Sequence, residues 1–536
     1  GYFTMKKLGG WESLDCDLRG HITGHLLSAL AMLYAQTGST AVKMKSDSIV
    51  NALNEVQQQY GNGYLSAFGE GLIDRNMKGK SVWAPFYTLH KIAQGLLDQY
   101  SLCHNDTALK EVTRMAHWAY TKLQGVDDEQ RRRMLRNEFG GFPEAMYNLY
   151  GFTRDEKALW VARFFYDNAK IDPLKQGNAD LGTNHANTFI PKLIGECRNY
   201  ELFGDTLSRK AAELLFRTLA FRHAFVTGEV SDKEHLFDPD QQSKHLTGYD
   251  GENCCTYNLL KLADHIFEWT ASREVADYYE RALYNHILGQ QDPQTSMVTY
   301  FTPLQTGAYR LYSTRDSSYW CCVGSGFESH VKYASSIWFH TSKDLYLNLF
   351  IPSRLDWEGT KVNLSTRFPA DGEVILKISG KSRRFTLKLR CPRWTTSMQV
   401  WVNGRRQKTD IKDGYASISR NWKQGDRVSI RYGMSLREEA TTDDPARTAL
   451  LYGPVVLAGE LDTVSHPFSS PKKYNDYYTY DYQVPASLVE HCQYHSINDF
   501  ESVGNLQWRS KNGILVKPFF DVHHHRYVVY WNKKEK

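Results

Sequence analysis

Four of the nine cysteines stand in two adjacent pairs. Cys254 and Cys255 lie in GYDGENCCTYN, just after Glu252, and Cys321 and Cys322 lie in SSYWCCVGSG. Zinc binds thiolates in tetrahedral sites and also accepts a carboxylate oxygen. A candidate set with three sulfurs and one carboxylate is therefore Glu252, Cys254, Cys321 and Cys322. Adjacent ligands favour a loop, and we predict one at WCCVGSG.

The cysteine pairs also have other interpretations. Free cysteine is among the most buried residue types, so these residues could simply belong to the core. A disulfide between adjacent cysteines would be strained and rare. The remaining cysteines are widely spread and odd in number, so they predict no disulfide framework: Cys16, Cys103, Cys197, Cys391 and Cys492.

A second candidate for chemistry is Glu234 in SDKEHLF, eighteen residues before Glu252. Glycoside hydrolysis commonly uses a proton donor and a nucleophile, which in retaining enzymes are two carboxyls about 5–5.5 Å apart. A metal-bound thiolate could replace one of them, because the metal keeps cysteine deprotonated at neutral pH. The alternative is that Glu234 is a solvated surface residue.

Two histidine groups do not predict metal sites. His21 and His25 lie four residues apart on one predicted helix, a spacing that can bind a metal. No carboxylate signature accompanies them, so sugar binding or core packing is favoured. The histidines of residues 523–525 lie in a strand-like run, where alternate side chains face opposite ways.

The elements that must position these residues change type near residue 340. Before it, apolar residues recur at three- and four-residue spacing, as in LRGHITGHLLSALAMLYAQTG and TYNLLKLADHIFEWT. This pattern predicts roughly ten to twelve helices, arranged as pairs around a ring. After it, VILKISG, MQVWVNG and RVSIRYG alternate with period two, which predicts an antiparallel sandwich. TALLYGPVVLAGE and PFFDVHHHRYVVYWN indicate a second β-rich section. The predicted fold class is multidomain α+β, with domains at 1–340, 341–437 and 438–536.

Length and composition limit the class of protein. A chain of 536 residues is expected to form two or three domains. The aromatic content of 13% suits sugar-binding surfaces as well as cores. The net charge of +5 is small, and Lys and Arg are scattered, so neither nucleic acid nor membrane is an expected partner. The opening GYFTMKKLGG is not a signal peptide and does not itself predict a location.

Seven segments together resemble one enzyme family. They are LGGWESLDCDLRGHITGH, WAPFYTLHKIAQGLLDQY, NHANTFIPK, SDKEHLF, GENCCTYNLLKLADHIF, SYWCCVGSGFESH and YGPVVLAGE. Over nearly its whole length the chain is similar to the β-L-arabinofuranosidases of glycoside hydrolase families 127 and 146. The resemblance implies an (α/α)6 barrel followed by β-sandwich domains. It also implies a retaining, exo-acting mechanism that releases L-arabinofuranose, with a Zn²⁺ site whose cysteine is the nucleophile.

The resemblance implies roles for individual residues. The metal ligands would be Glu252, Cys254, Cys321 and Cys322. Cys321 matches the nucleophile, and Glu234 falls where the family has its acid/base. His90 and His185 match histidines that contact the sugar, and Tyr300 matches an aromatic near the nucleophile. Glu144 and His21 are further candidates for substrate binding. EFGGFPEAM departs from the family 127 pattern, which has a histidine after the glycine, and this favours the family 146 branch. Cys255 receives no role.

The implied substrate is an arabinose-containing plant glycan or glycoprotein oligosaccharide. By analogy, the implied location is secreted or periplasmic in a bacterium. Because fold does not fix function, another glycosidase or a polysaccharide lyase on the same barrel stays open. A lyase would need a base at the sugar C5 and would not need the cysteine pairs. A zinc-stabilised carbohydrate-binding protein is a further alternative, and the oligomeric state is not predicted.

Overall fold

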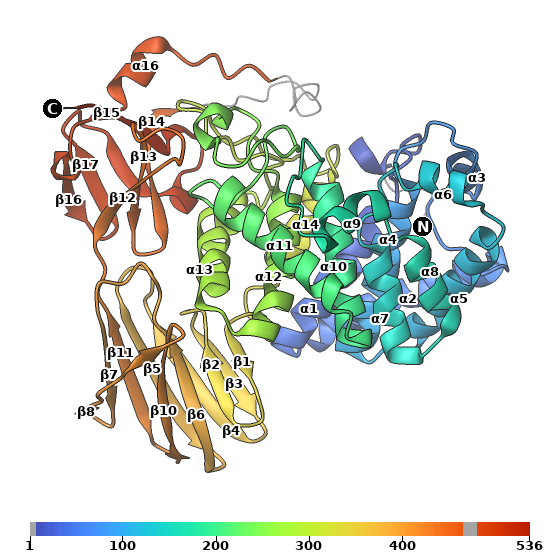
Figure 1. Cartoon of the computed structure of the whole chain (residues 1–536), viewed down its shortest axis with the longest axis horizontal. Coiled ribbons are helices and arrows are strands. Elements are labelled where there is room, and N and C mark those ends of the chain that lie inside the picture. Colours follow the sequence, from blue (N-terminus) through green and yellow to red (C-terminus); the bar gives the residue numbers. More distant parts are fainter. Residues whose placement is uncertain (1–6, 465–479, 536) are drawn as a thin grey trace.

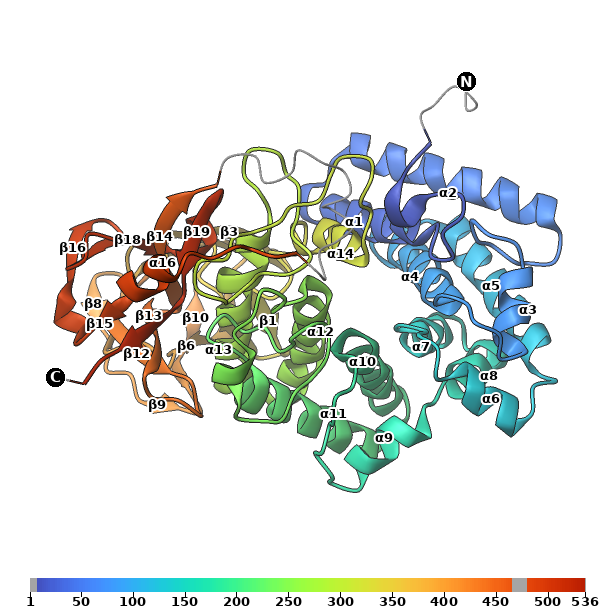
Figure 2. The ribbon, with the colours of Figure 1, turned by 90° about the horizontal axis from the view of Figure 1, so that it is seen from above.

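The computed structural model describes residues 7–464 and 480–535. In this part of the chain helices come first and strands follow (Figure 1). Six inner helices form a ring, each packed against the next, with the last closing against the first (Figure 2). They are α1 (His21–Thr37), α4 (Pro85–Cys103), α7 (Phe142–Thr153), α10 (Ala186–Phe203), α12 (Asn253–Thr270) and α14 (Cys321–Ser329).

Outer helices surround this ring. Among the described residues, five of the inner helices are each followed along the chain, directly or after a short turn, by an outer helix that packs against them. These outer helices are α2 (Thr40–Tyr60), α5 (Asp106–Leu123), α8 (Glu156–Phe164), α11 (Thr206–Thr218) and α13 (Arg273–Ala282). Three shorter helices lie in connections: α3 (Gly71–Met77), α6 (Asp128–Met134) and α9 (Asn168–Lys175). This arrangement confirms the predicted (α/α)6 barrel.

Burial explains which helices lie inside. α4 is buried along most of its length, whereas α2 buries only Ser46, Val50 and Gln57. A helix that is buried on all sides belongs to the interior of a large domain. Two glycines allow α1 and α4 to approach closely. A Cβ on Gly24 would lie 2.1 Å from the carbonyl oxygen of Lys91, and a Cβ on Gly95 would lie 2.5 Å from that of Gly24.

Two sheets form a sandwich after the barrel. One has the order β1-β2-β6-β10-β9 and the other β3-β4-β5-β11-β7-β8. The strands are β1 (Trp338–His340), β2 (Asp344–Leu347), β3 (Ser353–Trp357), β4 (Thr360–Thr366), β5 (Glu373–Gly380), β6 (Arg383–Arg390), β7 (Met398–Val402), β8 (Arg405–Arg406), β9 (Ile411–Lys412), β10 (Tyr415–Trp422) and β11 (Arg427–Tyr432). Buried and exposed residues alternate along β5 and β11, as expected for strands with one face on a core.

A third sheet completes the described chain. Its order is β15-β20-β13-β14-β18-β17-β16, with β12 paired to β13 and β19 paired to β14. Its strands are β12 (Leu436–Ala440), β13 (Arg447–Tyr452), β14 (Val455–Thr463), β15 (Gln493–Tyr494), β16 (Phe500–Gly504), β17 (Gln507–Ser510), β18 (Leu515–Pro518), β19 (His525–Val528) and β20 (Tyr530–Lys533), with α16 (Ala486–His491) before β15. The multidomain α+β class is thus confirmed, and the limits at 340/341 and 437/438 stay predictions.

A buried ion pair fastens the sandwich to the barrel. Arg390, at the end of β6, has no exposed side chain and lies beside α13. Its Nη1 donates to Asp277 Oδ1 at 2.5 Å, and its Nη2 donates to Glu280. A buried charge needs such partners, so the guanidinium fixes where the sandwich meets the barrel.

No helix among the residues the structure describes has the length and hydropathy to cross a membrane.

Candidate active site

The two cysteine pairs lie at the beginnings of two neighbouring inner helices. Glu252 is the N-cap residue of α12 and Cys254 stands in its first turn, while Cys321 and Cys322 begin α14. Contact between α12 and α14 brings the pairs together. The loop predicted at WCCVGSG is wrong, because residues 321–329 are helical. Adjacent ligands still reach one site, because both stand at the open end of the helix.

The ligand atoms form one compact and buried set. One sulfur or carboxylate oxygen from each of the four residues lies within 4.8 Å of the others. Cys254 Sγ lies 3.4 Å from Cys322 Sγ, and Cys322 Sγ lies 4.0 Å from Cys321 Sγ. With metal–sulfur bonds of about 2.3 Å, sulfurs at a tetrahedral site lie roughly 3.7 Å apart. Glu252 Oε1 lies 4.0 Å from the sulfurs of Cys321 and Cys322. The cluster therefore fits a metal ion.

Burial governs the protonation of this cluster. It raises the pKa of Glu252, Cys321 and Cys322 well above their ordinary values. Burial also acts to raise the pKa of Cys254, but hydrogen bonds from neighbours that include Cys321, Cys322 and Ser325 outweigh it and lower that pKa to about 7. A bound cation would displace the remaining protons, because it stabilises thiolate and carboxylate. The positive ends of two helix dipoles act in the same direction.

Cys255, which sequence reasoning left without a role, hydrogen-bonds the carboxylate oxygen of Glu252 that faces away from the metal set. Its Sγ donates to Glu252 Oε2 at 3.1 Å and lies 3.7 Å from the hydroxyl of Ser231. Oε1 of the same carboxylate faces the sulfurs of the metal set. Cys255 therefore orients a metal ligand without being one, as residues behind metal sites commonly do.

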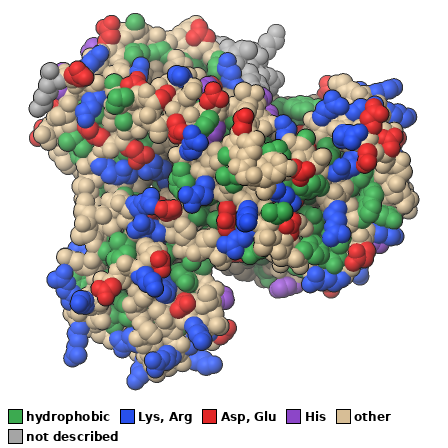
Figure 3. All heavy atoms as spheres, in the orientation of Figure 1, with side chains coloured by type: hydrophobic (Ala, Val, Ile, Leu, Met, Phe, Trp, Pro, Cys, Tyr) green, Lys and Arg blue, Asp and Glu red, His purple; other side chains and the backbone are tan. Residues whose placement is uncertain are grey.

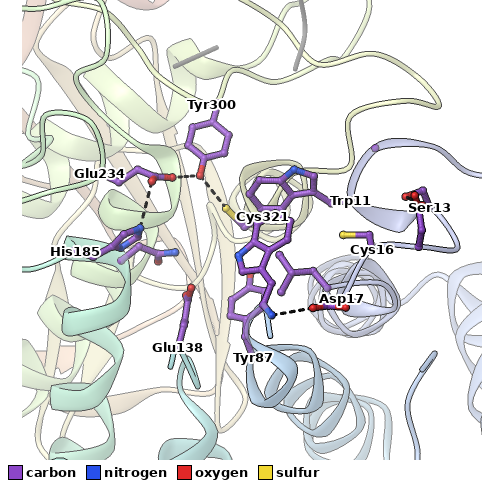
Figure 4. A pocket seen from close by; sticks show the side chains of 15 residues that line it. Trp11, Ser13, Cys16, Asp17, Tyr87, Glu138, His185, Glu234, Tyr300 and Cys321 are labelled. Carbon is purple, nitrogen blue, oxygen red and sulfur yellow. Dashed lines mark hydrogen bonds and ion pairs between the residues drawn. The ribbon is translucent and has the colours of Figure 1, made fainter. Parts of the chain in front are cut away.

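A cavity of about 650 Å³ opens in front of Cys321 (Figure 4). Of the four clustered residues, Cys321 is the one that lines it within the described chain. Other side chains that line it include Trp11, Cys16, Asp17, Trp83, Tyr87, Glu138, His185, Asn187, Glu234 and Tyr300. Cys321 is thus the sulfur of the cluster that a molecule in the cavity can reach.

A row of polar groups crosses the cavity from Cys321 to His185. The Tyr300 hydroxyl lies 3.6 Å from Cys321 Sγ and donates to Glu234 Oε1 (Figure 4). The other carboxylate oxygen of Glu234 lies 3.3 Å from His185 Nε2. The structure thus brings together Cys321, Tyr300, Glu234 and His185, and the roles that the resemblance implies for them stay predictions.

The backbone at Glu234 is unusual. Its φ is 66° and that of Lys233 is 48°, so both lie in the left-handed region that few non-glycine residues adopt. The carbonyl oxygen of Glu234 accepts a hydrogen bond from the amide of Ala186 at 2.8 Å, which helps to hold this conformation. Such conformations cluster at functional sites. Glu234 is also buried, so it is not the solvated surface residue of the alternative interpretation.

His185 stands at the N-cap of α10, where its Nδ1 accepts from the amide of Thr188 at 3.4 Å. Nε2 is therefore free to carry the proton that faces Glu234. Burial acts to lower the pKa of His185, but the hydrogen bond with Glu234 and the charges of Glu138 and Glu234 outweigh it and raise that pKa.

Three predicted sugar contacts lie behind the cavity wall. His21 is fully buried, with Nδ1 3.0 Å from Glu12 Oε1. His90 Nδ1 accepts from the amide of Gly141 at 3.1 Å, and burial lowers the pKa of His90 well below its usual range. Glu144 accepts from Lys261 Nζ at 2.9 Å through each carboxylate oxygen. None of the three lines the described cavity, so their direct contact with a sugar stays a prediction.

Sequence reasoning missed several side chains that do line the cavity, among them Trp11, Tyr87 and Glu138. Glu138 belongs to EFGGFPEAM, the segment in which Glu144 was the candidate, and burial raises the pKa of Glu138. One feature of the sequence could have indicated this: Glu138 lies two residues before Gly140 and Gly141, ahead of the start of α7. Tyr87 and Trp11 lie in the quoted segments WAPFYTLHKIAQGLLDQY and LGGWESLDCDLRGHITGH.

The barrel and its cavity suit a glycoside hydrolase, and comparisons identify the class and the family. The sequence profile for the β-L-arabinofuranosidase GH127 catalytic domain matches residues 3–335, and that for the GH127 middle domain matches residues 344–434. The chain belongs to the glycoside hydrolase family 127 β-L-arabinofuranosidases. These matches do not separate the family 127 and 146 branches, so the branch stays a prediction. A search of curated proteins finds no match.

Solved structures share the fold at low sequence identity. A GH127 β-L-arabinofuranosidase from Geobacillus stearothermophilus T6 is 18% identical, with a TM-score of 0.72 over 97% of this chain and 91% of that one. A second GH127 β-arabinofuranosidase is 18% identical, with a TM-score of 0.73 over 99% of this chain and 90% of that one. A third structure, of a glycoside hydrolase, is 14% identical, with a TM-score of 0.72 over 96% of this chain and 92% of that one.

Proposed function

We propose that the protein is a retaining, exo-acting glycosidase that releases L-arabinofuranose from β-L-arabinofuranosides. The observation that carries this proposal is the pairing of Cys321 and Glu234, which line one cavity and are joined through the Tyr300 hydroxyl. A nucleophile and a proton donor on the walls of one pocket suit hydrolysis by double displacement. The choice of sugar rests on membership of the family.

We infer that the metal is Zn²⁺, held by Glu252, Cys254, Cys321 and Cys322. A set dominated by thiolates selects zinc over magnesium or calcium, which prefer oxygen ligands. When bound, Zn²⁺ would keep the Cys321 sulfur deprotonated and stabilise it as a leaving group. Cys255 would keep Glu252 pointed at the ion, because it occupies the other carboxylate oxygen.

In the first step Cys321 Sγ attacks the anomeric carbon of the furanose. Glu234 gives its proton to the glycosidic oxygen, and the carbon–oxygen bond breaks with its electron pair on that oxygen. In the second step the Glu234 carboxylate takes a proton from water, the water oxygen bonds to the anomeric carbon, and the carbon–sulfur bond breaks. Two inversions retain the anomeric configuration.

Tyr300 and His185 prepare Glu234 for both steps. Each contacts a different carboxylate oxygen, so together they fix the plane of the carboxyl group. Fixing a catalytic group in its reactive orientation removes part of the entropic barrier. Trp11, on the opposite side of the cavity in Figure 4, supplies an aromatic surface for the sugar or its leaving group.

A second candidate nucleophile is Glu138. It lines the same cavity as Glu234, and two carboxyl groups form the usual catalytic pair of a retaining glycosidase. In that case the metal cluster would be purely structural. The cysteine mechanism is favoured because the Tyr300 hydroxyl links Cys321 to Glu234.

One experiment separates the two candidates. The protein is treated with an arabinofuranose-mimicking electrophile, and the labelled peptide is mapped by mass spectrometry. We expect the label on Cys321, together with retained configuration in the product seen by NMR. A label on Glu138 would replace the cysteine mechanism, and inverted product would exclude both.

We propose that the natural substrate is an arabinose-containing plant glycan or glycoprotein oligosaccharide, and activity on a panel of such glycans tests this. We also propose a secreted or periplasmic location, which cell fractionation tests.

A further inference from the structure

The basic residues of the chain gather in the sandwich. Residues 338–432, from β1 to β11, contain 19 Lys and Arg but only eight Asp and Glu, a formal net charge of +11. The whole chain carries +5, so the remainder carries −6. Figure 3 shows Lys and Arg spread over the surface of this sandwich, at the lower left of the view. The small net charge of the whole chain therefore hides a strong separation between domains.

One exposed sheet face concentrates these charges around a tryptophan. Lys377 on β5 pairs with Arg427 on β11, and Trp401 on β7 pairs with Arg406 on β8. Because side chains alternate along a strand, these residues share the outer face with Arg431. We call this surface the basic face. Its four cationic side chains are exposed and Trp401 is half-buried.

The basic face has the form of an open binding surface. A shallow groove of about 360 Å³ runs along Trp401, Arg427, Ser429 and Arg431, and the guanidinium carbon of Arg431 lies 5.7 Å from the centre of the Trp401 ring. Glu373, opposite Arg431, is the acidic residue of this groove. The ion pairs found among described sandwich residues are made by other cations, including Lys361, Arg367, Arg383 and Arg420. The charge of the basic face is thus available to a ligand.

We propose that the basic face binds a polysaccharide that carries carboxylate groups, such as a chain of uronic acids. Arg427 and Arg431 offer planar donors that match carboxylates, and Trp401 offers a flat apolar surface for a sugar ring. A sheet face also suits an extended polymer better than a cavity would. Net charge complementarity favours a polyanion, and the choice of a polysaccharide rests on the proposed function as a glycosidase.

Such binding would hold the catalytic domain near its substrate. The cavity at Cys321 belongs to the barrel, whereas the basic face belongs to a different domain (Figure 1). A polymer bound at one domain raises the effective concentration of its branches at the other. The two sites thus have separate readouts, and binding is measured without any turnover. If the protein bound the polymer but did not hydrolyse β-L-arabinofuranosides, the proposed function would be wrong and this inference would not be affected.

The test uses affinity electrophoresis of the full chain in gels that contain polygalacturonate. We expect the wild-type protein to be retarded, with much less retardation in gels that contain neutral arabinan. Rising salt should weaken the retardation, because the contacts are ionic. Equal retardation in both polysaccharides would overturn the proposal. Tighter binding to duplex DNA than to polygalacturonate, measured at the same salt concentration, would overturn it as well.

Variants locate the binding surface. We expect Arg427→Glu combined with Arg431→Glu to weaken binding at least about 10-fold, since two attractive charges become repulsive. Lys377→Glu combined with Arg406→Glu should act similarly, which guards against a folding defect in the first pair. The matched control is Lys110→Glu with Arg132→Glu, two exposed positions on the barrel. An equal loss in this control would show that only net charge matters and would overturn the basic face as the site.

Discussion

Cys254 and Cys322 stand 68 positions apart in the chain, yet their Sγ atoms lie 3.4 Å from each other. One sulfur comes from the first turn of α12 and the other from the first turn of α14. A metal bound by both sulfurs would therefore link two inner helices of the barrel. It would also keep the Cys321 sulfur deprotonated. Metal content, stability and activity should change together when this contact is broken.

We expect Cys254→Ser to lose both zinc and activity. The wild-type protein should carry about one equivalent of zinc, and a hydroxyl is a poor ligand beside thiolates. Elemental analysis after purification without chelator gives the metal content, and hydrolysis of p-nitrophenyl β-L-arabinofuranoside gives the activity. Cys103→Ser, a buried cysteine at the end of α4, is the control. Full zinc content in Cys254→Ser would contradict the ligand set.

Cys321→Ser should be nearly inactive although folded, because serine lacks the sulfur nucleophile. The neighbouring pair provides a matched control. Cys255→Ser keeps a donor toward Glu252, so its turnover should stay within a few-fold of wild type. Thermal unfolding of both variants checks that they fold. If Cys321→Ser retained activity close to that of Cys255→Ser, another residue would have to be the nucleophile.

Glu234→Gln keeps the shape of the side chain but removes the transferable proton. Turnover of substrates with poor leaving groups should fall by roughly 10²–10⁴. Activated aryl leaving groups need less protonation, so their first step should be affected less. Burst kinetics on aryl and alkyl arabinofuranosides separate the two steps. A loss of only a few-fold on alkyl substrates would assign the acid to another residue.

The pair of His185 and Glu234 should stabilise the protein more at low pH. Burial acts to lower the pKa of His185, but the hydrogen bond with Glu234 and the charges of Glu138 and Glu234 together raise it. Its contribution is therefore complete below the ordinary histidine pKa and disappears as the pH rises through the raised value. His185→Asn, which keeps an N-cap acceptor, should cost at most about 1 kcal/mol at pH 6 and less at pH 9. Urea denaturation measures this difference, and a cost that grows with pH would have the wrong sign.

Trp83 should affect the leaving group rather than the cleaved sugar. Its side chain is 43% exposed at the cavity mouth and packs edge-on against Trp11, with ring centres 4.6 Å apart. Trp83→Ala should raise KM for an arabinose-containing oligosaccharide roughly 2- to 10-fold through lost aromatic contact. KM for methyl β-L-arabinofuranoside should not change. Steady-state kinetics on both substrates compare them, and an equal rise would place Trp83 at the cleaved sugar.

Local sequence patterns predicted the ring of helix pairs, the sandwich and a candidate cysteine cluster, and the family resemblance implied the (α/α)6 barrel. They could not decide which of two glutamates in EFGGFPEAM lines the cavity. α7 begins at Phe142, so Glu144 is carried into the helix and reaches Lys261 on α12. Glu138 precedes the helix and stays at the cavity. The difference depends on where the helix begins relative to its neighbours, which a short motif does not encode.

The histidines show the same limit. His21 and His90 lie on inner helices, where the sequence indicates burial but not which side of the barrel each side chain faces. Packing of α1 on α4 turns His21 toward Glu12 and away from the cavity. His185 reaches the cavity because it caps the start of α10. A position at a helix start is not sufficient, however, because His21 is the first residue of α1 and still contacts Glu12 instead of lining the cavity.

The closure of the ring by α14 also sets an order of events during synthesis. α1 packs against α14, the last inner helix, which supplies Cys321 and Cys322. At roughly 5–20 residues per second, a ribosome needs about 15–60 s to travel from one helix to the other. Throughout that interval the side of α1 that packs on α14 has no partner, and Cys254, once made, waits a further 67 residues for Cys321. The ring of inner helices and the complete ligand set therefore form only after α14, the last inner helix, has been made.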